Sequence, residues 1–304
     1  MKKEMLELLA EKINLKNKNA EEILELSIEE IANAVKELGH ENTKYLPRNE
    51  IESILKTKYI GKELYCFKAV KSTNTVAKFL AEYGVSEGTV IISETQTRGR
   101  GRSGKKWESP VGGIWLSIIL DPDVSLAKAP LLTLAAGVAV TKTLKSFGIA
   151  SEIKWTNDIL IQDKKVCGIL TESIAKLNSI DHVIVGVGIN ADLNISNLPY
   201  EIQEGSISLN EVANDQVNKI KGIAKFLEEF ENIYEIFKKE DFEYIFKEWR
   251  DHSHTIGKYV EIKQPFGKVI SGYAVGINQE GALILEQRDG KLVKILSGEC
   301  RVIE

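Results

Sequence analysis

Residues 97–107 read Thr97-Arg98-Gly99-Arg100-Gly101-Arg102-Ser103-Gly104-Lys105-Lys106-Trp107, and this stretch decides how the rest of the chain is interpreted. Its glycines spell the GxGxxG pattern of a dinucleotide-binding loop, which must open a helix whose N-terminus holds a pyrophosphate. Here the loop runs instead into Trp107, Pro110 and another apolar strand. The spacing also approaches a P-loop, but Lys106 stands where a serine or threonine would bind magnesium. Neither kind of nucleotide-binding loop is therefore predicted.

The segment is better described as a strand–loop–strand connection with five cations in nine residues, from Arg98 to Lys106. Glycine lets the backbone approach a ligand closely, and arginine offers a fork of donors that suits carboxylate and phosphate. The combination favours a site where an anionic group meets a nucleotide phosphate. The alternative is a solvated basic loop that binds RNA through arginine and glycine.

Two further motifs place polar groups at the ends of apolar strands. The first is Lys154-Trp155-Thr156-Asn157-Asp158 followed by Lys165-Val166-Cys167-Gly168-Ile169-Leu170, a predicted hairpin that can project an ammonium group into a cleft. The second is Gly186-Val187-Gly188-Ile189-Asn190, whose glycines permit close approach and whose asparagine can pair with a hydroxyl or a base edge. The alternatives are an ordinary hairpin with a polar turn and a tight strand crossing in a packed core.

Composition excludes several classes of protein. The net charge of −4 gives no basic field toward nucleic acid or an anionic membrane. The longest apolar stretch, Ala129–Val140, is too short to span a bilayer, and the acidic N-terminus is not a signal peptide. Cys66, Cys167 and Cys300 form no Cys-x-x-Cys pair and are expected to be reduced thiols of a cytoplasmic protein.

A pair of histidines, His252 and His254, stands two residues apart and could face one way on a strand. No HExxH or similar ligand spacing accompanies them. A solvated linker is therefore preferred here over a zinc site.

Apolar periodicity predicts the elements. Residues 1–48 and 49–58 are expected to be helical, and a helix should follow Ser72-Thr73-Asn74. Longer helices are expected over Leu126–Phe147 and 213–250. Strands are expected at Glu63–Val70, Thr89–Ser93, Ile114–Leu120, Ile159–Gln162, Val166–Ser173 and His182–Ile189. Beyond residue 254, short strands with glycine turns indicate a small all-β unit.

The joint pattern resembles the biotin protein ligases. Ser72-Thr73-Asn74, Gln96 with GRGRSGKKW, KWTND, KVCGIL and GVGIN occur in the order and approximate spacing of that family, across residues 63–195. The C-terminal stretch around residues 274–283 is similar to the family's SH3-like domain, a combination that the lipoate ligases lack. Thr156 departs from the family's usual proline.

The resemblance implies an α+β fold of the biotin/lipoate ligase type. A central mixed β-sheet flanked by helices would carry an N-terminal helical domain and a small C-terminal SH3-like β-barrel. The expected domains are residues 1–60, 61–250 and 251–304.

The resemblance also implies the reaction and its residues. Biotin and ATP would form biotinyl-5′-AMP, and biotin would then pass to a lysine of a biotin carboxyl carrier domain, with magnesium accompanying ATP through unidentified ligands. Catalytic roles fall to Arg102, Lys165 and Asp158. Biotin contacts fall to Ser72, Thr73, Asn74, Gln96, Arg100, Gly101, Arg102, Lys165, Gly168 and Gly186. ATP and adenylate contacts fall to Arg100, Trp107, Lys154, Asn157, Lys165 and Asn190. Trp107 should form part of the pocket wall around the adenine. The loop that carries it should be disordered without ligand and should fold over the ligand when it binds.

Some members of this family carry an N-terminal winged helix-turn-helix and also act as biotin-responsive repressors. Residues 21–38 could form such a unit, with Ile28–Leu38 as its second helix. Residues 1–48 nevertheless hold eight Lys plus Arg against ten Glu, whereas a DNA-reading domain needs a basic surface. A degenerate domain or an interaction module is therefore favoured over a DNA-binding repressor. The sequence leaves a homodimer open.

Overall fold

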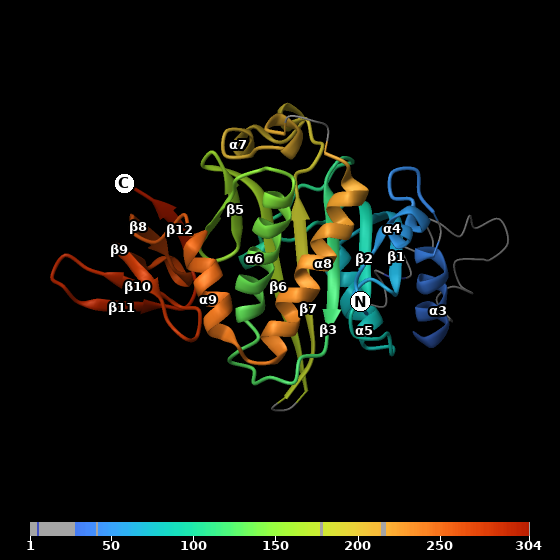
Figure 1. Cartoon of the computed structure of the whole chain (residues 1–304), viewed down its shortest axis with the longest axis horizontal. Helices are drawn as coiled ribbons and strands as arrows, with labels where there is room; N and C mark the ends of the chain where they lie inside the picture. The colour runs from blue at the N-terminus through green and yellow to red at the C-terminus, as the bar shows by residue number, and fades with distance from the viewer. Residues whose placement is uncertain (1–4, 6–27, 41, 177–178, 214–216, 304) are drawn as a thin grey trace.

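The computed structural model describes residues 5, 28–40, 42–176, 179–213 and 217–303. At its centre is a seven-stranded mixed sheet with the order β1-β2-β3-β7-β6-β5-β4 (Figure 1). The strands are β1 (Leu64–Val70), β2 (Val90–Gln96), β3 (Ile114–Leu120), β4 (Glu152–Lys154), β5 (Asp158–Ile161), β6 (Lys164–Lys176) and β7 (Ser179–Ile189). The predicted α+β fold with a central mixed sheet is confirmed.

Connections between neighbouring strands set the direction of each pair. β1 and β2 run parallel because helix α5 (Thr73–Ala81) crosses between them, and the other neighbours in this sheet are antiparallel. The β5–β6 hairpin turns through Gln162 and Asp163, both at positive φ (51° and 62°), which matches the twist of a two-residue turn. The predicted turn at residues 163–165 was therefore placed too late, since Lys165 already belongs to β6.

The two faces of the sheet pack against different helices (Figure 1). Leu64 and Cys66 of β1 join the core formed with α6 (Leu131–Ser146), α8 (Lys219–Lys238) and α9 (Phe242–Asp251). Tyr65 and Phe67 alternate with them and join a second core with α5 and α3 (Ile28–Gly39). Successive side chains of a strand point to opposite faces, so this apolar strand is covered on both sides.

The helical stretch predicted over residues 213–250 is divided in two. α8 ends at Lys238, and Glu240 then adopts a positive φ of 56°. The carboxylate of Asp241 caps α9 by accepting a hydrogen bond from the backbone amide of Tyr244. An acidic side chain at this position satisfies one of the free amides of the new helix, so the chain turns a corner here rather than continuing.

Two other helix limits also differ from the prediction. The run Leu126–Phe147 becomes α-helical only at Leu131, directly after Pro130, whose fixed φ suits the start of a helix. Ser72 precedes α5 as expected, but its side chain makes no capping hydrogen bond. The shorter elements are α4 (Arg48–Ile54), α7 (Tyr200–Gln203), η1 (Arg102–Gly104), η2 (Ile195–Asn197), η3 (Leu209–Glu211) and η4 (Pro265–Gly267).

The N-terminal helix α3 is attached to the central sheet. It buries Ile31 and Val35 in the same core as Tyr65 of β1. Glu29 and Glu37 lie on its exposed side. The helices predicted before residue 28 lie outside the described residues. The apolar face of α3 is therefore already occupied, and acidic side chains mark the face that remains.

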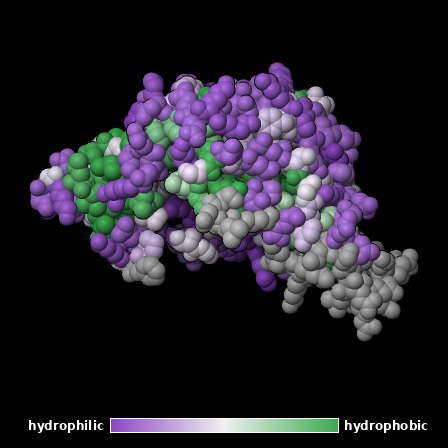
Figure 2. All heavy atoms as spheres, turned by 90° about the horizontal axis from the view of Figure 1, so that it is seen from below, coloured by the Kyte–Doolittle hydropathy of each residue, from purple (hydrophilic) through white to green (hydrophobic). Residues whose placement is uncertain are grey.

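The C-terminal unit is an antiparallel five-stranded sheet with the order β11-β10-β9-β8-β12, as the prediction of a small SH3-like unit requires. Its strands are β8 (Tyr259–Lys263), β9 (Val269–Ile277), β10 (Leu283–Glu286), β11 (Leu292–Ile295) and β12 (Glu299–Val302). Figure 2 shows an apolar patch over this unit, where Val269, Val275 and Leu292 are exposed.

The segment that joins α9 to this sheet is not the solvated linker predicted around His252 and His254. Ser253 bridges to Ile153 of β4, and His254 is buried with its Nε2 2.7 Å from an Asp163 carboxylate oxygen. A polar group buried in this way needs a partner, and the hairpin turn supplies it. Within the described ranges, no group of three potential ligands could hold a metal ion. Across the same ranges, each helix is too short or too polar to cross a membrane.

Glu231 of α8 offers a test of how the N-terminal part is attached. This carboxylate is 6% exposed and accepts backbone N–H groups from Lys58 (2.7 Å), Tyr59 (3.0 Å) and Ile60 (2.9 Å). Glu231→Ala should lower the free energy of unfolding by about 2–4 kcal/mol, because buried amides lose their acceptor. Urea unfolding measures the change.

A matched control lies one turn earlier on the same helix. Glu228 is partly exposed and contacts Lys225 at 3.4 Å, so Glu228→Ala should change the free energy of unfolding by less than about 0.5 kcal/mol. Equal unfolding midpoints for the two variants would contradict the structural role assigned to Glu231.

Candidate functional site

A cleft of about 550 Å³ opens between the glycine–arginine loop, the centre of the large sheet and the C-terminal unit. Every residue to which the sequence assigned a site role lines it: Ser72, Thr73, Asn74, Gln96, Arg100, Gly101, Arg102, Trp107, Lys154, Asn157, Asp158, Lys165, Gly168, Gly186 and Asn190. They come from the start of α5, the loop after β2, the β5–β6 hairpin and the end of β7. The fold thus brings motifs that are far apart in the sequence together in one cleft.

The loop follows a compact path without an α-helix. A single 3₁₀ turn spans Arg102–Gly104, with Ser103 at φ 55° and Gly104 at φ 76°. Gly99 is needed for packing, because a Cβ atom there would lie 2.3 Å from the carbonyl oxygen of Trp107. A three-residue turn supplies no aligned row of amides for a pyrophosphate, so both rejected loop types are absent from this segment.

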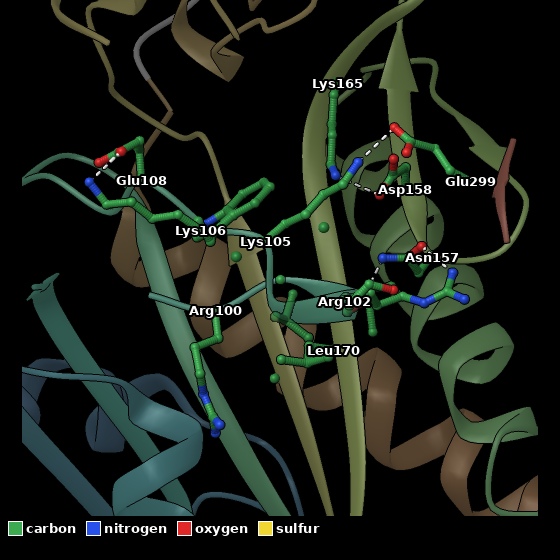
Figure 3. Close-up of a pocket in the computed structure, with 18 of the residues that line it drawn as sticks. Arg100, Arg102, Lys105, Lys106, Glu108, Asn157, Asp158, Lys165, Leu170 and Glu299 are labelled. Atoms are coloured by element: carbon green, nitrogen blue, oxygen red, sulfur yellow. Dashed lines mark hydrogen bonds and ion pairs between the residues drawn. The ribbon is translucent and has the colours of Figure 1, made fainter. Parts of the chain in front are cut away.

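Four cations of the loop have partners in the protein (Figure 3). Arg100 pairs with Glu172 at 3.1 Å, and Arg102 donates to the Asn157 side-chain oxygen at 2.9 Å. Farther along the loop, the ammonium groups pair with carboxylates: Lys105 with Glu299 at 2.7 Å and Lys106 with Glu108 at 2.6 Å. In Figure 3, Arg100 points away from the group formed by Arg102, Asp158 and Lys165.

The indole of Trp107 covers the middle of the sheet. An ideal Cβ on Gly168 would lie 2.9 Å from its ring, and one on Gly188 would lie 2.5 Å from its Nε1. Any larger side chain at either position would displace the ring. The Trp107 ring packs edge-on against Trp115, with 6.3 Å between the ring centroids. The buried Nε1 of Trp107 has no hydrogen-bond partner among the described residues. The glycines of two separate motifs therefore form one seat for an aromatic ring.

The polar end of the cleft is a hydrogen-bonded network. The backbone amide of Thr73 donates to the Gln96 side-chain oxygen at 2.8 Å, and the Gln96 amide group donates to the Ser109 hydroxyl at 2.8 Å. Beneath them, the buried Ser117 hydroxyl lies 2.7 Å from that of Thr73 and 2.6 Å from the Asn74 side-chain oxygen. These side chains are oriented by one another before any ligand arrives.

The other end of the cleft is built by the β5–β6 hairpin. The Lys165 ammonium lies 2.6 Å from an Asp158 carboxylate oxygen and 5.0 Å from the centre of the Trp107 ring. The amide group of Asn157 donates to the Ile169 carbonyl at 2.9 Å. The Asn190 amide group donates to the carbonyls of Lys165 and residue 207, so it holds the backbone beside the lysine.

Burial shifts the ionisation of several groups here. It lowers the pKa of the Arg102 guanidinium below its usual value, and the charge of Asp158 partly opposes this. Burial alone would raise the pKa of Glu172, but hydrogen bonds from Lys78 and Asn74 and the charge of Arg100 leave it below its ordinary value. Burial also raises the pKa of the Cys167 thiol, so this cysteine is neutral and unreactive.

The sequence did not identify several residues that complete this site. Ser117 lies on β3, which no motif marked, Glu172 lies on β6 beyond the end of the KVCGIL motif, and Gly188 was recognised only as part of a strand end. The C-terminal unit adds Lys263, Gln264 and Glu299 to the rim, and Leu198 and Ile202 line the opposite side. The Gly-x-Gly spacing on β7 was the available signal for the seat of Trp107, since two glycines on one strand face need a reason.

Comparison with known proteins identifies the family. The chain matches the biotin/lipoate A/B protein ligase family over residues 66–190 and the biotin protein ligase C-terminal domain over residues 255–302. It is 37% identical over 259 residues to the bifunctional ligase/repressor BirA of Bacillus subtilis, which covers 84% of this chain and 79% of that protein. It is 29% identical to the biotin–[acetyl-CoA-carboxylase] ligase of Mycobacterium tuberculosis, across 70% of this chain and 78% of the other.

A solved structure agrees with these matches. The biotin protein ligase from Aquifex aeolicus, in complex with biotin and ATP, superposes with a TM-score of 0.68 at 31% identity and covers 79% of this chain and 98% of that one. The two family matches include strands of the large sheet and of the C-terminal unit. The chain therefore belongs to the biotin protein ligase family.

Proposed function

We propose that this ligase activates biotin with ATP in the cleft and passes it to a lysine of a biotin carboxyl carrier domain. In the first step a biotin carboxylate oxygen bonds to the α-phosphorus of ATP, and pyrophosphate leaves. In the second step the lysine nitrogen bonds to the biotin carbonyl carbon, AMP leaves, and the amine loses a proton. The observation that carries the proposal is the gathering into one cleft of all the residues to which the sequence assigned a site role.

The arrangement suits a reaction between two anions. Carboxylate and triphosphate repel each other, so cations held where they meet lower the barrier. Arg102 and Lys165 are the proposed charges at this junction, and Arg100 reaches it by leaving Glu172. The network of Ser72, Thr73, Asn74 and Gln96 is proposed to hold the biotin ring. On the nucleotide side, Trp107, Lys154, Asn157 and Asn190 are the proposed contacts.

Asp158 is the proposed group for the second step. Its carboxylate lies beside Lys165 on the hairpin, where it can orient the incoming acceptor lysine or accept its proton. Binding of an anion by Lys165 would release Asp158 for that role.

Magnesium is expected to arrive with ATP. Each carboxylate lining the cleft is already engaged by a lysine: Asp158 by Lys165, Glu108 by Lys106 and Glu299 by Lys105. Magnesium readily keeps its waters and binds through substrate phosphates. The residues around the cleft do not form a ready cation site. The buried free cysteines fit a reducing, cytoplasmic location.

The first test is isotope exchange between pyrophosphate and ATP. The wild-type chain should catalyse exchange that depends on biotin, and Lys165→Ala should slow it about a hundredfold or more, as loss of a donor that acts in the transition state does. The matched control is Lys164→Ala, because Lys164 is an exposed neighbour on the same strand. Exchange supported by lipoate but not by biotin would overturn the proposed substrate, and wild-type rates in Lys165→Ala would remove that residue from the site.

The second test concerns retention of the adenylate. Arg102→Gly removes a buried guanidinium that joins the loop to Asn157, so biotin should bind more weakly and biotinyl-5′-AMP should escape before transfer. Escaped adenylate reacts with any amine, and the variant should therefore biotinylate albumin in a streptavidin blot while the wild type does not. Arg98→Gly makes the same change at an exposed loop position outside the cleft and should leave the blot clean. Equal adenylate release from the two variants would contradict the role of Arg102.

The alternative function is repression of transcription, which the name of the Bacillus subtilis relative includes. Helix α3 argues against it here, because its apolar face is packed on the ligase core and its outer face carries Glu29 and Glu37. We expect no gel shift of DNA from upstream of its own gene or of biotin genes, with or without biotin and ATP. A shift that requires biotin and ATP would establish the repressor function.

A further inference from the structure

Glu172 lies below the cleft and connects three elements that build it. It follows Gly168 and Leu170 on the same face of β6, since alternate residues of a strand point the same way. Its oxygens lie 2.6 Å from the Lys78 ammonium, 2.8 Å from the Asn74 side-chain nitrogen and 3.1 Å from the Arg100 guanidinium.

The charge of Glu172 determines which way the Asn74 amide faces. The pKa of this carboxyl lies below its ordinary value, so at neutral pH both oxygens can only accept hydrogen bonds. The side-chain nitrogen of Asn74 therefore points toward Glu172 and the Leu170 carbonyl, at 2.8 and 3.3 Å. A flipped amide would place its oxygen against both of these acceptors. Gly186 makes room for this amide group, because a Cβ there would lie 2.2 Å from the Asn74 oxygen.

With Asn74 oriented, the protons of the next two hydroxyls have fixed places. The Ser117 hydroxyl lies 2.6 Å from the Asn74 oxygen and 2.7 Å from the Thr73 hydroxyl, and both distances require a proton. The Asn74 oxygen has none to give, so Ser117 must donate to it. Thr73 then donates to Ser117, the nearer of its two acceptors, because the Ser117 hydroxyl lies 2.7 Å away and the Gln96 side-chain oxygen 3.2 Å. The Thr73 oxygen is left as an acceptor on the wall of the cleft, with its own proton already committed.

We propose that Glu172 is a positioning residue that sets the direction of the chain Asn74–Ser117–Thr73 and so presents Thr73 to the ligand as a hydrogen-bond acceptor. The matching ligand group is an N–H donor, which the ureido ring of biotin carries, so this inference rests on the proposed function. Glu172 acts through Asn74 and needs no contact with the ligand.

The test measures biotin binding by calorimetry without ATP, on the full chain. Glu172→Gln can donate as well as accept, so the longer contact with the Leu170 carbonyl is the one that still orients Asn74, and biotin affinity should fall about tenfold. In a Thr73→Val background, the same Glu172→Gln change should have little further effect, because the two residues act along one chain. Lys78→Met is the matched control: it removes an ion pair of Glu172 but leaves the contact with Asn74, and its affinity should stay within about twofold of wild type.

Ser117→Ala provides a second route to the same answer. It cuts the chain between Asn74 and Thr73 without changing charge, and it should weaken biotin binding about as much as Glu172→Gln does. Wild-type affinity in either Glu172→Gln or Ser117→Ala would overturn the proposal, as would additive effects of Glu172→Gln and Thr73→Val. An equal loss in Lys78→Met would show that the ion pairs, and not the orientation of Asn74, matter. Failure of the wild-type chain to bind biotin would instead refute the proposed function itself.

Discussion

Repulsion between the cations of one short loop is the constraint on which this structure depends. Like charges so close together favour an extended, mobile chain, yet the site needs them beside a cleft that receives anions. Acceptors from different parts of the fold bind these cations. Glu172 of the large sheet binds Arg100, Asn157 beside the hairpin binds Arg102, and Glu299 of the C-terminal unit binds Lys105. Each holds one cation with a single contact. An anionic ligand can then replace these partners one at a time.

This arrangement explains why the C-terminal unit is part of the catalytic body. The Lys105–Glu299 pair joins it to the loop, and the contact between His254 and Asp163 joins its connecting segment to the hairpin that carries Lys165. The first pair is exposed and contributes little to stability, but it places a carboxylate of the C-terminal unit beside the loop. In the contact between His254 and Asp163, the histidine side chain is buried. The small sheet thereby takes part in the geometry of both ends of the cleft.

Apolar runs and turn residues are local signals, so they predicted most of the strands. The mixed sheet and the roles of the site residues followed from the resemblance to a family, which the joint order of the motifs revealed. The sequence could not indicate Glu172, which meets Arg100 across 72 positions of sequence, because such a contact exists only after the strands pair. The turn of the β5–β6 hairpin was misplaced because the predicted strands ended at Gln162 and resumed at Val166, whereas the chain turns through Gln162 and Asp163.

The seat of Trp107 also gives the molecule a built-in optical reporter. The chain has four tryptophans, and three of them, Trp115, Trp155 and Trp249, are at most 2% exposed and lie in the core. Only Trp107 among them is half-buried on a cleft wall, with its ring over Gly188 and its indole nitrogen without a partner. Trp155 also lines the cleft but is 2% exposed, so a change in the polarity of the cleft acts mainly on Trp107. The intrinsic fluorescence of the unmodified chain can follow the filling and emptying of the cleft in real time, without a label.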